Sequence, residues 1–160
     1  MKIFLDMDGV LAQLVPAVLA YHKLDPHWPK GEYSMEVVTG VNVFENLPPL
    51  IYQHLEPEPE CFELLSMFPD AIICTNASCY SEYHKWKWLE AHDIQNEVIF
   101  IKDKYLLARP DRLLIDDYEQ NCIGWAEAGG LAFIWGQRWN SAPERNKLEL
   151  LKGFLNGNDQ

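Results

Sequence analysis

Short apolar runs alternate with longer segments of helical periodicity along most of the chain. The apolar runs predict buried strands at residues 3–5, 71–74, 98–101, 112–115 and 131–135. Between them, apolar positions recur every three or four residues, which predicts helices at residues 11–21, 59–68, 80–92, 119–128 and 143–155. This alternation favours parallel strands joined by right-handed crossovers, with helices on both faces. We therefore expect an α/β fold, a Rossmann-like three-layer sandwich with a central parallel sheet of about five strands.

The segment 23–59 interrupts this alternation. It carries six prolines and has no clear period, but aromatic residues are spread through it, unlike in low-complexity sequence. We expect a small, partly helical cap inserted after the first strand, at approximately residues 14–58 of a single domain spanning 1–160. Pro16 is expected to bend the helix before this segment or to mark its start. Aromatic side chains of the cap either pack on the core or form a wall for a flat ring.

Composition narrows the class of protein. A chain of 160 residues with 48% hydrophobic content can bury one substantial core. The formal charge of -11 argues against a polyanionic partner held by a broad basic surface, but not against a small anion held by a few cations. The four cysteines, Cys61, Cys74, Cys79 and Cys122, lack metal-site spacing and are interpreted as reduced core or near-core thiols.

Two further features concern location. The first predicted strand begins at Ile3, which leaves no room for a signal peptide before it. No apolar run approaches the length of a membrane span. We expect a soluble, cytoplasmic protein that has no membrane partner.

Asp6 and Asp8 directly follow the first predicted strand, and Gly9 comes next. In parallel sheets, ligands bind outside the carboxyl ends of the strands. Side chains two residues apart on an extended chain point the same way, so these carboxylates would repel each other unless a hard divalent cation were bound. The local sequence alone does not decide between a divalent-cation site and two solvated acids in an ordinary turn after a strand.

Polar residues also follow three later strands, and a parallel sheet would bring them to the same edge. They are Thr75 and Asn76, then Lys102 and Lys104, then Asp116 and Asp117. A helix start after Thr75 would suit an oxyanion, although an ordinary cap by Asn76 or Ser78 is the simpler interpretation. Spacing alone allows either lysine to reach the site.

Together, these motifs resemble those of the haloacid dehalogenase-like (HAD) phosphatase superfamily: an Asp-x-Asp, a Thr, a Lys and an acidic pair, in order, on successive strand ends. The similarity covers nearly the whole chain. A narrower resemblance, to the 5'(3')-deoxyribonucleotidase family, rests on residues 6–12, 44–47, 73–75, 85–90, 103–104 and 114–117. The short cap, Asn76-Ala77 and Lys102 depart from that family, which leaves the base preference open.

The resemblance implies a Mg²⁺-dependent phosphomonoester hydrolase that acts on deoxyribonucleoside monophosphates. Asp6 would be the nucleophile that forms an aspartyl phosphate, and Asp8 the general acid and base. Mg²⁺ would bind Asp6, the backbone carbonyl of Asp8, and Asp116. Asp117 would orient a water molecule on the metal or Lys104.

The resemblance also implies the substrate contacts. The expected phosphate-binding residues are Thr75, Asn76, Lys104 and Lys85, with Lys104 preferred to Lys102 because of the Asp-Lys similarity. Without the resemblance, Lys85 would be interpreted as a solvated lysine. Phe44 is the first candidate for stacking on a base, followed by Trp28 and Tyr33.

Other functions stay open at this stage. One is a phosphatase for another small phosphoester or for a nucleic-acid 3'-phosphate end, the latter disfavoured by the acidic charge. Capture of the aspartyl phosphate by an alcohol would give a phosphotransferase. A non-catalytic binding protein is disfavoured because Asp6 and Asp8 are both present. The resemblance also allows a homodimer.

Overall fold

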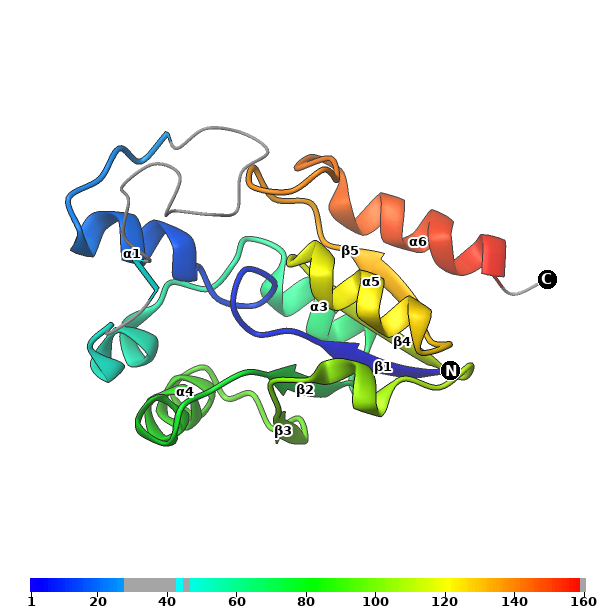
Figure 1. Cartoon of the computed structure of the whole chain (residues 1–160), viewed down its shortest axis with the longest axis horizontal. Helices are drawn as coiled ribbons and strands as arrows, with labels where there is room; N and C mark the ends of the chain where they lie inside the picture. The colour runs from blue at the N-terminus through cyan, green and yellow to red at the C-terminus, as the bar shows by residue number, and fades with distance from the viewer. Residues whose placement is uncertain (28–42, 45–46, 159–160) are drawn as a thin grey trace.

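The computed structural model describes residues 1–27, 43–44 and 47–158. Five parallel strands form one sheet in the order β3-β2-β1-β4-β5 (Figure 1). Their bounds are β1 Lys2–Leu5, β2 Ile72–Thr75, β3 Val98–Phe100, β4 Arg112–Asp116 and β5 Leu131–Ile134. The α/β fold and the central parallel sheet predicted from the sequence are confirmed.

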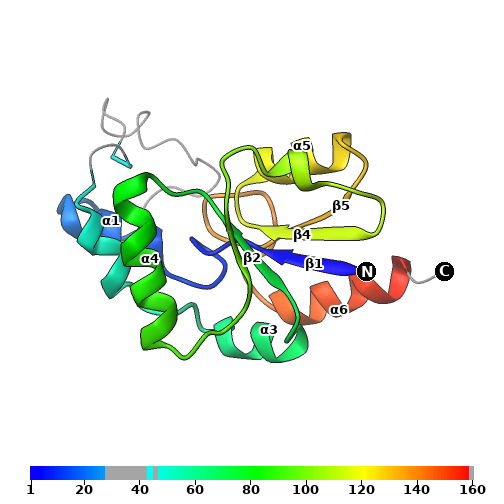
Figure 2. The same ribbon diagram turned by 90° about the horizontal axis from the view of Figure 1, so that it is seen from below.

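Helices connect the strands and cover both faces of the sheet. They are α1 Leu14–Tyr21, α3 Cys61–Met67, α4 Cys79–Ala91, α5 Glu119–Glu127 and α6 Lys147–Asn158, with 3-10 turns η1 Pro49–His54 and η2 Lys104–Leu107. Figure 2 shows α3 and α6 on one side of the sheet and α5 on the other. The N-terminus and the end of α6 lie on one side of the molecule, and α1 lies on the opposite side (Figure 1).

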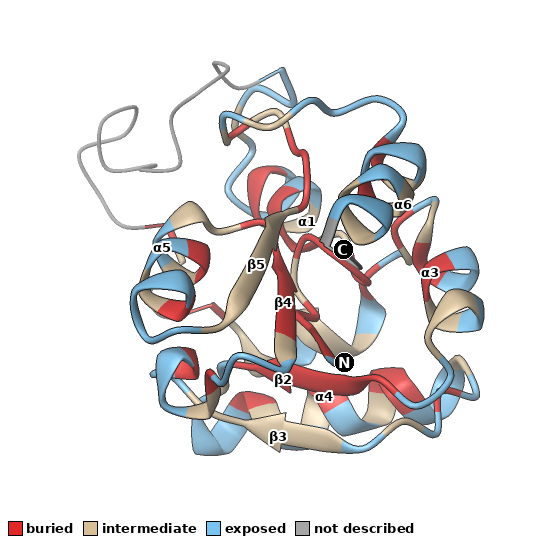
Figure 3. Cartoon of the chain, turned by 90° about the vertical axis from the view of Figure 1, so that its right-hand side faces the viewer, coloured by how far each residue is buried: buried red, intermediate tan, exposed pale blue. Residues whose placement is uncertain are grey.

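The alternation of side chains along β1 divides the core into two clusters. Ile3 and Leu5 face a large cluster that includes residues of α1, α3, α4 and α6. Phe4 faces the smaller cluster on the other side, where it packs against Trp125 of α5 with ring centroids 5.2 Å apart. The central strands are buried, whereas β3 and β5 at the edges are half-buried (Figure 3). The site-bearing ends of β1, β2 and β4 are therefore held by the most buried part of the sheet.

Two predicted helices begin later than expected. The first starts at Leu14 because residues 6–12 form a turn, and Pro16 then falls in the first helical turn, where its missing N–H costs no hydrogen bond. The last was predicted from Pro143 but starts at Lys147. Asn146 has a φ of 59°, a left-handed conformation that a helix cannot contain.

Two of the contacts between the described part of the predicted cap and the core bear on the site. The η1 turn packs against α4. The chain then returns along the turn after β1: Ala12 pairs with Pro57 in an antiparallel bridge, and Glu58 donates its N–H to Leu11. The return leg of the cap is thus joined directly to the segment that carries Asp6 and Asp8. Trp28 and Tyr33 lie outside the described residues, and the cap boundaries at 14–58 stay a prediction.

The cysteines are all free thiols. Cys61, Cys74 and Cys122 are buried, as expected, but Cys79 is exposed. It is the first residue of α4, a position that the helical pattern did not resolve from the neighbouring loop. Among the described residues, no helix combines the length and apolar character needed to cross a bilayer.

Ser78, not Asn76, caps α4. The Ser78 hydroxyl accepts the Ser81 N–H at 3.2 Å, and the Ser81 hydroxyl accepts the Ser78 N–H at 2.9 Å. This reciprocal pair is a capping box, which satisfies two N–H groups of the helix start.

We predict that Ser78→Ala lowers the free energy of unfolding by about 1 kcal/mol, because one orphaned N–H loses its acceptor. Ser66→Ala, on the exposed face of α3, is the matched control and should change stability by less than about 0.5 kcal/mol. Urea unfolding of both variants measures the difference. Equal losses would mean that the cap contributes nothing.

Candidate active site

Lys104 lies between two buried carboxylates at the carboxyl edge of the sheet. Its ammonium nitrogen is 2.7 Å from Asp6 Oδ1 and 2.6 Å from Asp116 Oδ2. Burial opposes the charge of this lysine, but Asp116 and Asp6 outweigh that cost and raise its pKa. Lys102, two residues earlier, is exposed. Of the two lysines that the spacing left open, Lys104 is therefore the one among the acids.

Asp117 completes a group of three carboxylates. One oxygen from each of Asp6, Asp116 and Asp117 lies within 4.8 Å of the others, and all three residues are buried. Burial raises the pKa of Asp116 to about 6, with Lys104 opposing the shift. Burial, reinforced by the charges of Asp116 and Asp6, raises the pKa of Asp117 well above its usual range.

This donor set fits a hard divalent cation. The Lys104 ammonium pairs with Asp6 and Asp116, so three carboxylates are grouped around one such ion-pair partner and negative charge is in excess. Oxygen ligands are those that Mg²⁺ prefers. Sequence reasoning placed Asp117 outside the ligand set, whereas the structure brings its carboxylate into the same group. Asp116 is also fixed by the Tyr118 N–H and the Asn121 amide, each at 2.9 Å.

A second buried lysine joins Asp8 to Thr75. Lys85 of α4 donates to Asp8 Oδ2 at 2.5 Å, to Thr75 Oγ1 at 2.8 Å and to the backbone oxygen of Asn76 at 2.7 Å. Only 1% of the Lys85 side chain is exposed, so the alternative of a solvated lysine is wrong for this residue. The Asn76 side chain is exposed.

The second carboxyl oxygen of Asp8 has a different environment. Asp8 Oδ1 is buried and has no hydrogen-bond partner among the described residues. Burial raises the pKa of Asp8, and the charge of Lys85 opposes this shift. Such a carboxyl group holds a proton more readily than a solvated aspartate does.

Tyr52 of η1 is an additional residue at this site. Its ring centroid is 5.1 Å from the Lys85 ammonium, and burial together with the charge of Asp8 raises its pKa. Phe44, the first candidate for stacking on a base, is partly buried and packs against the larger core cluster. Sequence reasoning missed Tyr52 because the segment around it has no periodicity that would orient it.

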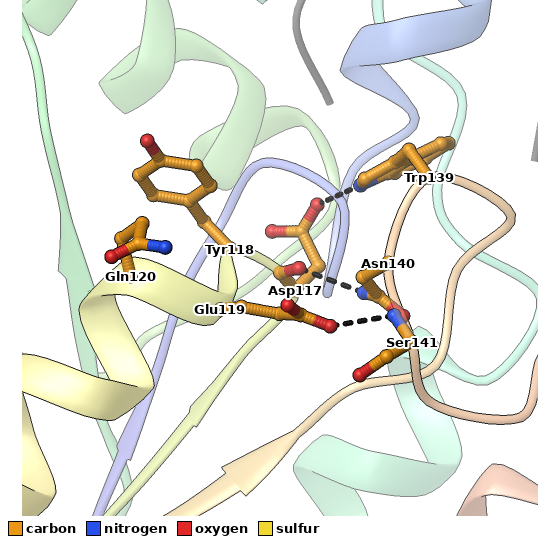
Figure 4. Close-up of a pocket in the computed structure, with 7 residues that line it drawn as sticks. All are labelled: Asp117, Tyr118, Glu119, Gln120, Trp139, Asn140 and Ser141. Carbon is orange, nitrogen blue, oxygen red and sulfur yellow. Dashed lines mark hydrogen bonds between the residues drawn. The ribbon is translucent and has the colours of Figure 1, made fainter. Parts of the chain in front are cut away.

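The loop after β5 also reaches the site. Trp139 donates its indole N–H to Asp117 Oδ2 at 2.7 Å, and the Asn140 amide donates to the Asp117 backbone oxygen at 2.7 Å (Figure 4). This loop lies outside the four motifs, and nothing in its sequence indicates contact with strand ends elsewhere in the chain.

A cavity of about 190 Å³ lies beside Asp117, between the start of α5 and the loop after β5 (Figure 4). Its lining is polar and aromatic, and comprises Asp117, Tyr118, Glu119, Gln120, Trp139, Asn140 and Ser141. Glu119 closes one side by accepting the Ser141 N–H at 2.6 Å. Asp117 therefore belongs both to the set of three carboxylates and to the lining of this cavity.

No family model matches the chain. No curated protein matches it either.

Solved structures share its fold. A HAD-superfamily hydrolase of subfamily IA, variant 1, from Geobacter sulfurreducens has a TM-score of 0.57 and 13% identity, over 93% of this chain and 98% of that one. An L-2-haloacid dehalogenase from Xanthobacter autotrophicus has a TM-score of 0.55 and 13% identity, over 95% and 82%. A HAD family enzyme from Bacteroides thetaiotaomicron, in complex with magnesium and inorganic phosphate, has a TM-score of 0.50 and 14% identity, over 89% and 97%. The chain therefore has the fold of HAD hydrolases, as its motifs predicted.

The turn after β1 depends on Gly9, which has a φ of 79°. A Cβ atom at this position would lie 2.3 Å from Asp117 Oδ2, whereas a Cβ at Gly129, with a similar φ of 88°, would meet nothing within 4 Å. We predict that Gly129→Ala costs about 1–2 kcal/mol from backbone strain alone. Gly9→Ala should cost a further ~1–3 kcal/mol, because the carboxylate of Asp117 must move.

Denaturant unfolding of the two glycine variants measures this difference. Equal destabilisation would contradict the close approach of Asp117 to the turn.

Proposed function

We propose that the protein is a Mg²⁺-dependent phosphomonoester hydrolase that acts through an aspartyl phosphate on Asp6. The observation that carries the proposal is the meeting of Asp6, Asp116 and Asp117 around Lys104, beside a second set formed by Asp8, Lys85 and Thr75. Hydrolysis of phosphate monoesters is very slow without a catalyst, so an enzyme must supply positioned charge of this kind.

Asp6 would act as the nucleophile. Lys104 holds its Oδ1, which leaves the other oxygen to attack phosphorus. The new bond joins this oxygen to phosphorus while the bond from phosphorus to the ester oxygen breaks. In the second step, water attacks phosphorus, so that the acyl phosphate is cleaved and Asp6 is regenerated.

Asp8 would move the protons. Its raised pKa and its buried, unpartnered Oδ1 suit a group that protonates the departing ester oxygen. The resulting carboxylate would then take a proton from the attacking water. Lys85, at Oδ2, would keep the carboxyl group in place through both steps.

Thr75, Lys104 and Lys85 would bind the non-bridging phosphate oxygens. The Thr75 hydroxyl and both ammonium groups are buried, where hydrogen bonds to an anion are stronger than in water. The Asn76 backbone oxygen accepts a hydrogen bond from Lys85. We propose that the N–H or the side chain of Asn76 provides a further donor to the phosphate.

Mg²⁺ would neutralise charge between the anionic nucleophile and the anionic phosphate. We propose Asp6, the backbone carbonyl of Asp8, and Asp116 as its ligands. Trp139 donates to Oδ2 of Asp117, and one oxygen of this carboxylate lies within 4.8 Å of those of Asp6 and Asp116. The Bacteroides enzyme, which has the same fold, is in complex with magnesium and inorganic phosphate, and this supports the proposal of a Mg²⁺ site in this chain.

The proposed substrate is a deoxyribonucleoside monophosphate. This finer proposal rests on the sequence resemblance and on aromatic residues of the cap, of which Tyr52 lies beside Lys85. The charge of -11 disfavours a polynucleotide. Because a haloacid dehalogenase shares the fold, 2-haloacids are tested alongside phosphoesters.

The homodimer and the cytoplasmic location also stay predictions.

Product release from a panel of substrates tests the function. The panel contains deoxy- and ribonucleoside 5'- and 3'-monophosphates, sugar phosphates, a 3'-phosphorylated oligonucleotide and 2-chloropropionate, each with Mg²⁺ or EDTA. We predict phosphate release that requires Mg²⁺ and is greatest on deoxynucleotides. Asp6→Asn should reduce it by about 10³-fold or more, because an amide is a poor nucleophile. Asp70→Asn, at an exposed acid, is the matched control.

Each outcome of the panel decides one part of the proposal. Turnover of other phosphoesters would keep the mechanism and reject the nucleotide substrate. Halide release without phosphate release would reject the phosphatase, and inactivity on the whole panel would favour a binding role.

The two lysines of α4 provide a second test. Lys85→Met should lower kcat/KM by about 10²-fold or more, because it removes buried charge from Asp8, Thr75 and the phosphate. Lys87→Met should stay within about twofold of the parent, since Lys87 is exposed and pairs only with Glu90 among the described acids. Steady-state kinetics on folded protein measures both. Similar activity of the two variants would refute the role of Lys85.

A further inference from the structure

The orientation of the Asp8 carbonyl is set at Gly9. The Gly9 N–H donates to the Ala12 oxygen at 2.7 Å. Because this N–H and the Asp8 carbonyl belong to one planar trans peptide, the carbonyl must point away from Ala12. The Gly9 oxygen belongs to the next peptide, Gly9–Val10, which joins the Asp8–Gly9 peptide at the Gly9 Cα. A group that holds this oxygen therefore restricts rotation at Gly9, and with it movement of the proposed backbone ligand of the cation.

Gln137, in the loop after β5, binds the Gly9 carbonyl. Its Nε2 donates to the Gly9 oxygen at 2.7 Å and to Glu58 Oε1 at 3.1 Å. Gln137 and Glu58 are 9% and 7% exposed, so water does not compete freely for these bonds. A flip of the amide would place its oxygen against two acceptors, and the Gln137 side chain is consequently held in one orientation.

Glu58 is itself held from two directions. The Glu58 N–H donates to the oxygen of Leu11, a residue of the turn after β1, at 2.8 Å. On the other side, the ammonium group of Lys147 in α6 lies 4.0 Å from Glu58 Oε2 and 3.1 Å from Glu60 Oε2. The acceptor that orients Gln137 is thus anchored both to the turn and to a helix of the core.

Asp8 needs this support from the backbone. Its side chain is held through Oδ2 by Lys85, whereas its Oδ1 has no partner among the described residues. Asp117 also lies against Gly9, since a Cβ atom built there would be 2.3 Å from Asp117 Oδ2, so two side chains from elsewhere in the chain approach this glycine.

We propose that Gln137 is a positioning residue for the proposed reaction: by holding the Gly9–Val10 peptide, it restricts the turn at Gly9, which keeps the Asp8 carbonyl aimed at the cation site and the Asp8 carboxyl group on Lys85. Glu58 sets the orientation of the Gln137 amide. This inference rests on the proposed function for its catalytic consequence, but not for its effect on cation binding.

The experiment compares Gln137→Met with Gln95→Met, a control at an exposed loop residue. Calorimetric titration with Mg²⁺ should show affinity weakened by about tenfold in Gln137→Met, as expected for loss of a group that orients a ligand. The kcat on the best substrate should fall by about 10- to 100-fold, with KM within about twofold. Gln95→Met should match the parent in each measurement.

Glu58 variants keep the test decisive if Gln137→Met does not fold. Glu58→Gln retains an oxygen acceptor and should preserve Mg²⁺ affinity and kcat, whereas Glu58→Met should lower both.

Three results are informative. Folded Gln137→Met with parental Mg²⁺ affinity and kcat would overturn the inference. A lower melting temperature without those losses would also overturn it, because it would indicate a purely structural role. If the parent protein hydrolyses no phosphoester, the proposed function fails, but the Mg²⁺ titration still decides whether Gln137 positions the turn.

Discussion

The ammonium group of Lys104, held between Asp6 and Asp116 inside the molecule, is the interaction on which the rest of the site depends. Burying carboxylates is costly, and their pKa values rise when no positive charge is near. Lys104 offsets this cost for two acids from different strands. It can do so only because β1 and β4 are adjacent in the sheet and end at the same edge. The sheet topology and the buried ion pairs therefore require each other.

The charges of the site explain why a cation is expected. Four carboxylates, those of Asp6, Asp8, Asp116 and Asp117, meet the ammonium groups of Lys85 and Lys104. With every group ionised, a net charge of two negative units stays buried, which one divalent cation would neutralise. Burial, with a smaller contribution from neighbouring carboxylates, raises the pKa values of Asp8, Asp116 and Asp117. That cation and both lysines would offset the repulsion between these acids and an incoming anion.

The sequence predicted the parts of this site that lie at strand ends. Apolar runs located β1, β2 and β4, and the residues just beyond them were Asp6, Thr75 and Asp116, which a parallel sheet must bring together. The position of Lys85 was not predictable from helical pattern alone. Its burial depends on α4 and η1 packing together around the end of β2, a tertiary contact that leaves no mark on periodicity.

The sequence did not predict the loop residues that donate hydrogen bonds to the site, for a related reason. Gln137 and Trp139 lie beyond the last strand, and each contacts a backbone or side-chain atom more than twenty residues away. Amide and indole groups in a loop are ordinary surface residues until the fold places acceptors beside them. The late start of α6 likewise depends on the backbone conformation of Asn146, which side-chain pattern does not specify.

Detection of the covalent intermediate tests the central claim most directly. The parent protein, mixed with its best phosphoester substrate and Mg²⁺, is quenched and reduced with borohydride, which converts an aspartyl phosphate to homoserine. Peptide mass spectrometry then locates the reduced residue. The account predicts homoserine at position 6 with Mg²⁺ and none with EDTA. Steady release of phosphate with position 6 unmodified at every time of quenching, or with the modification at position 8, would contradict it.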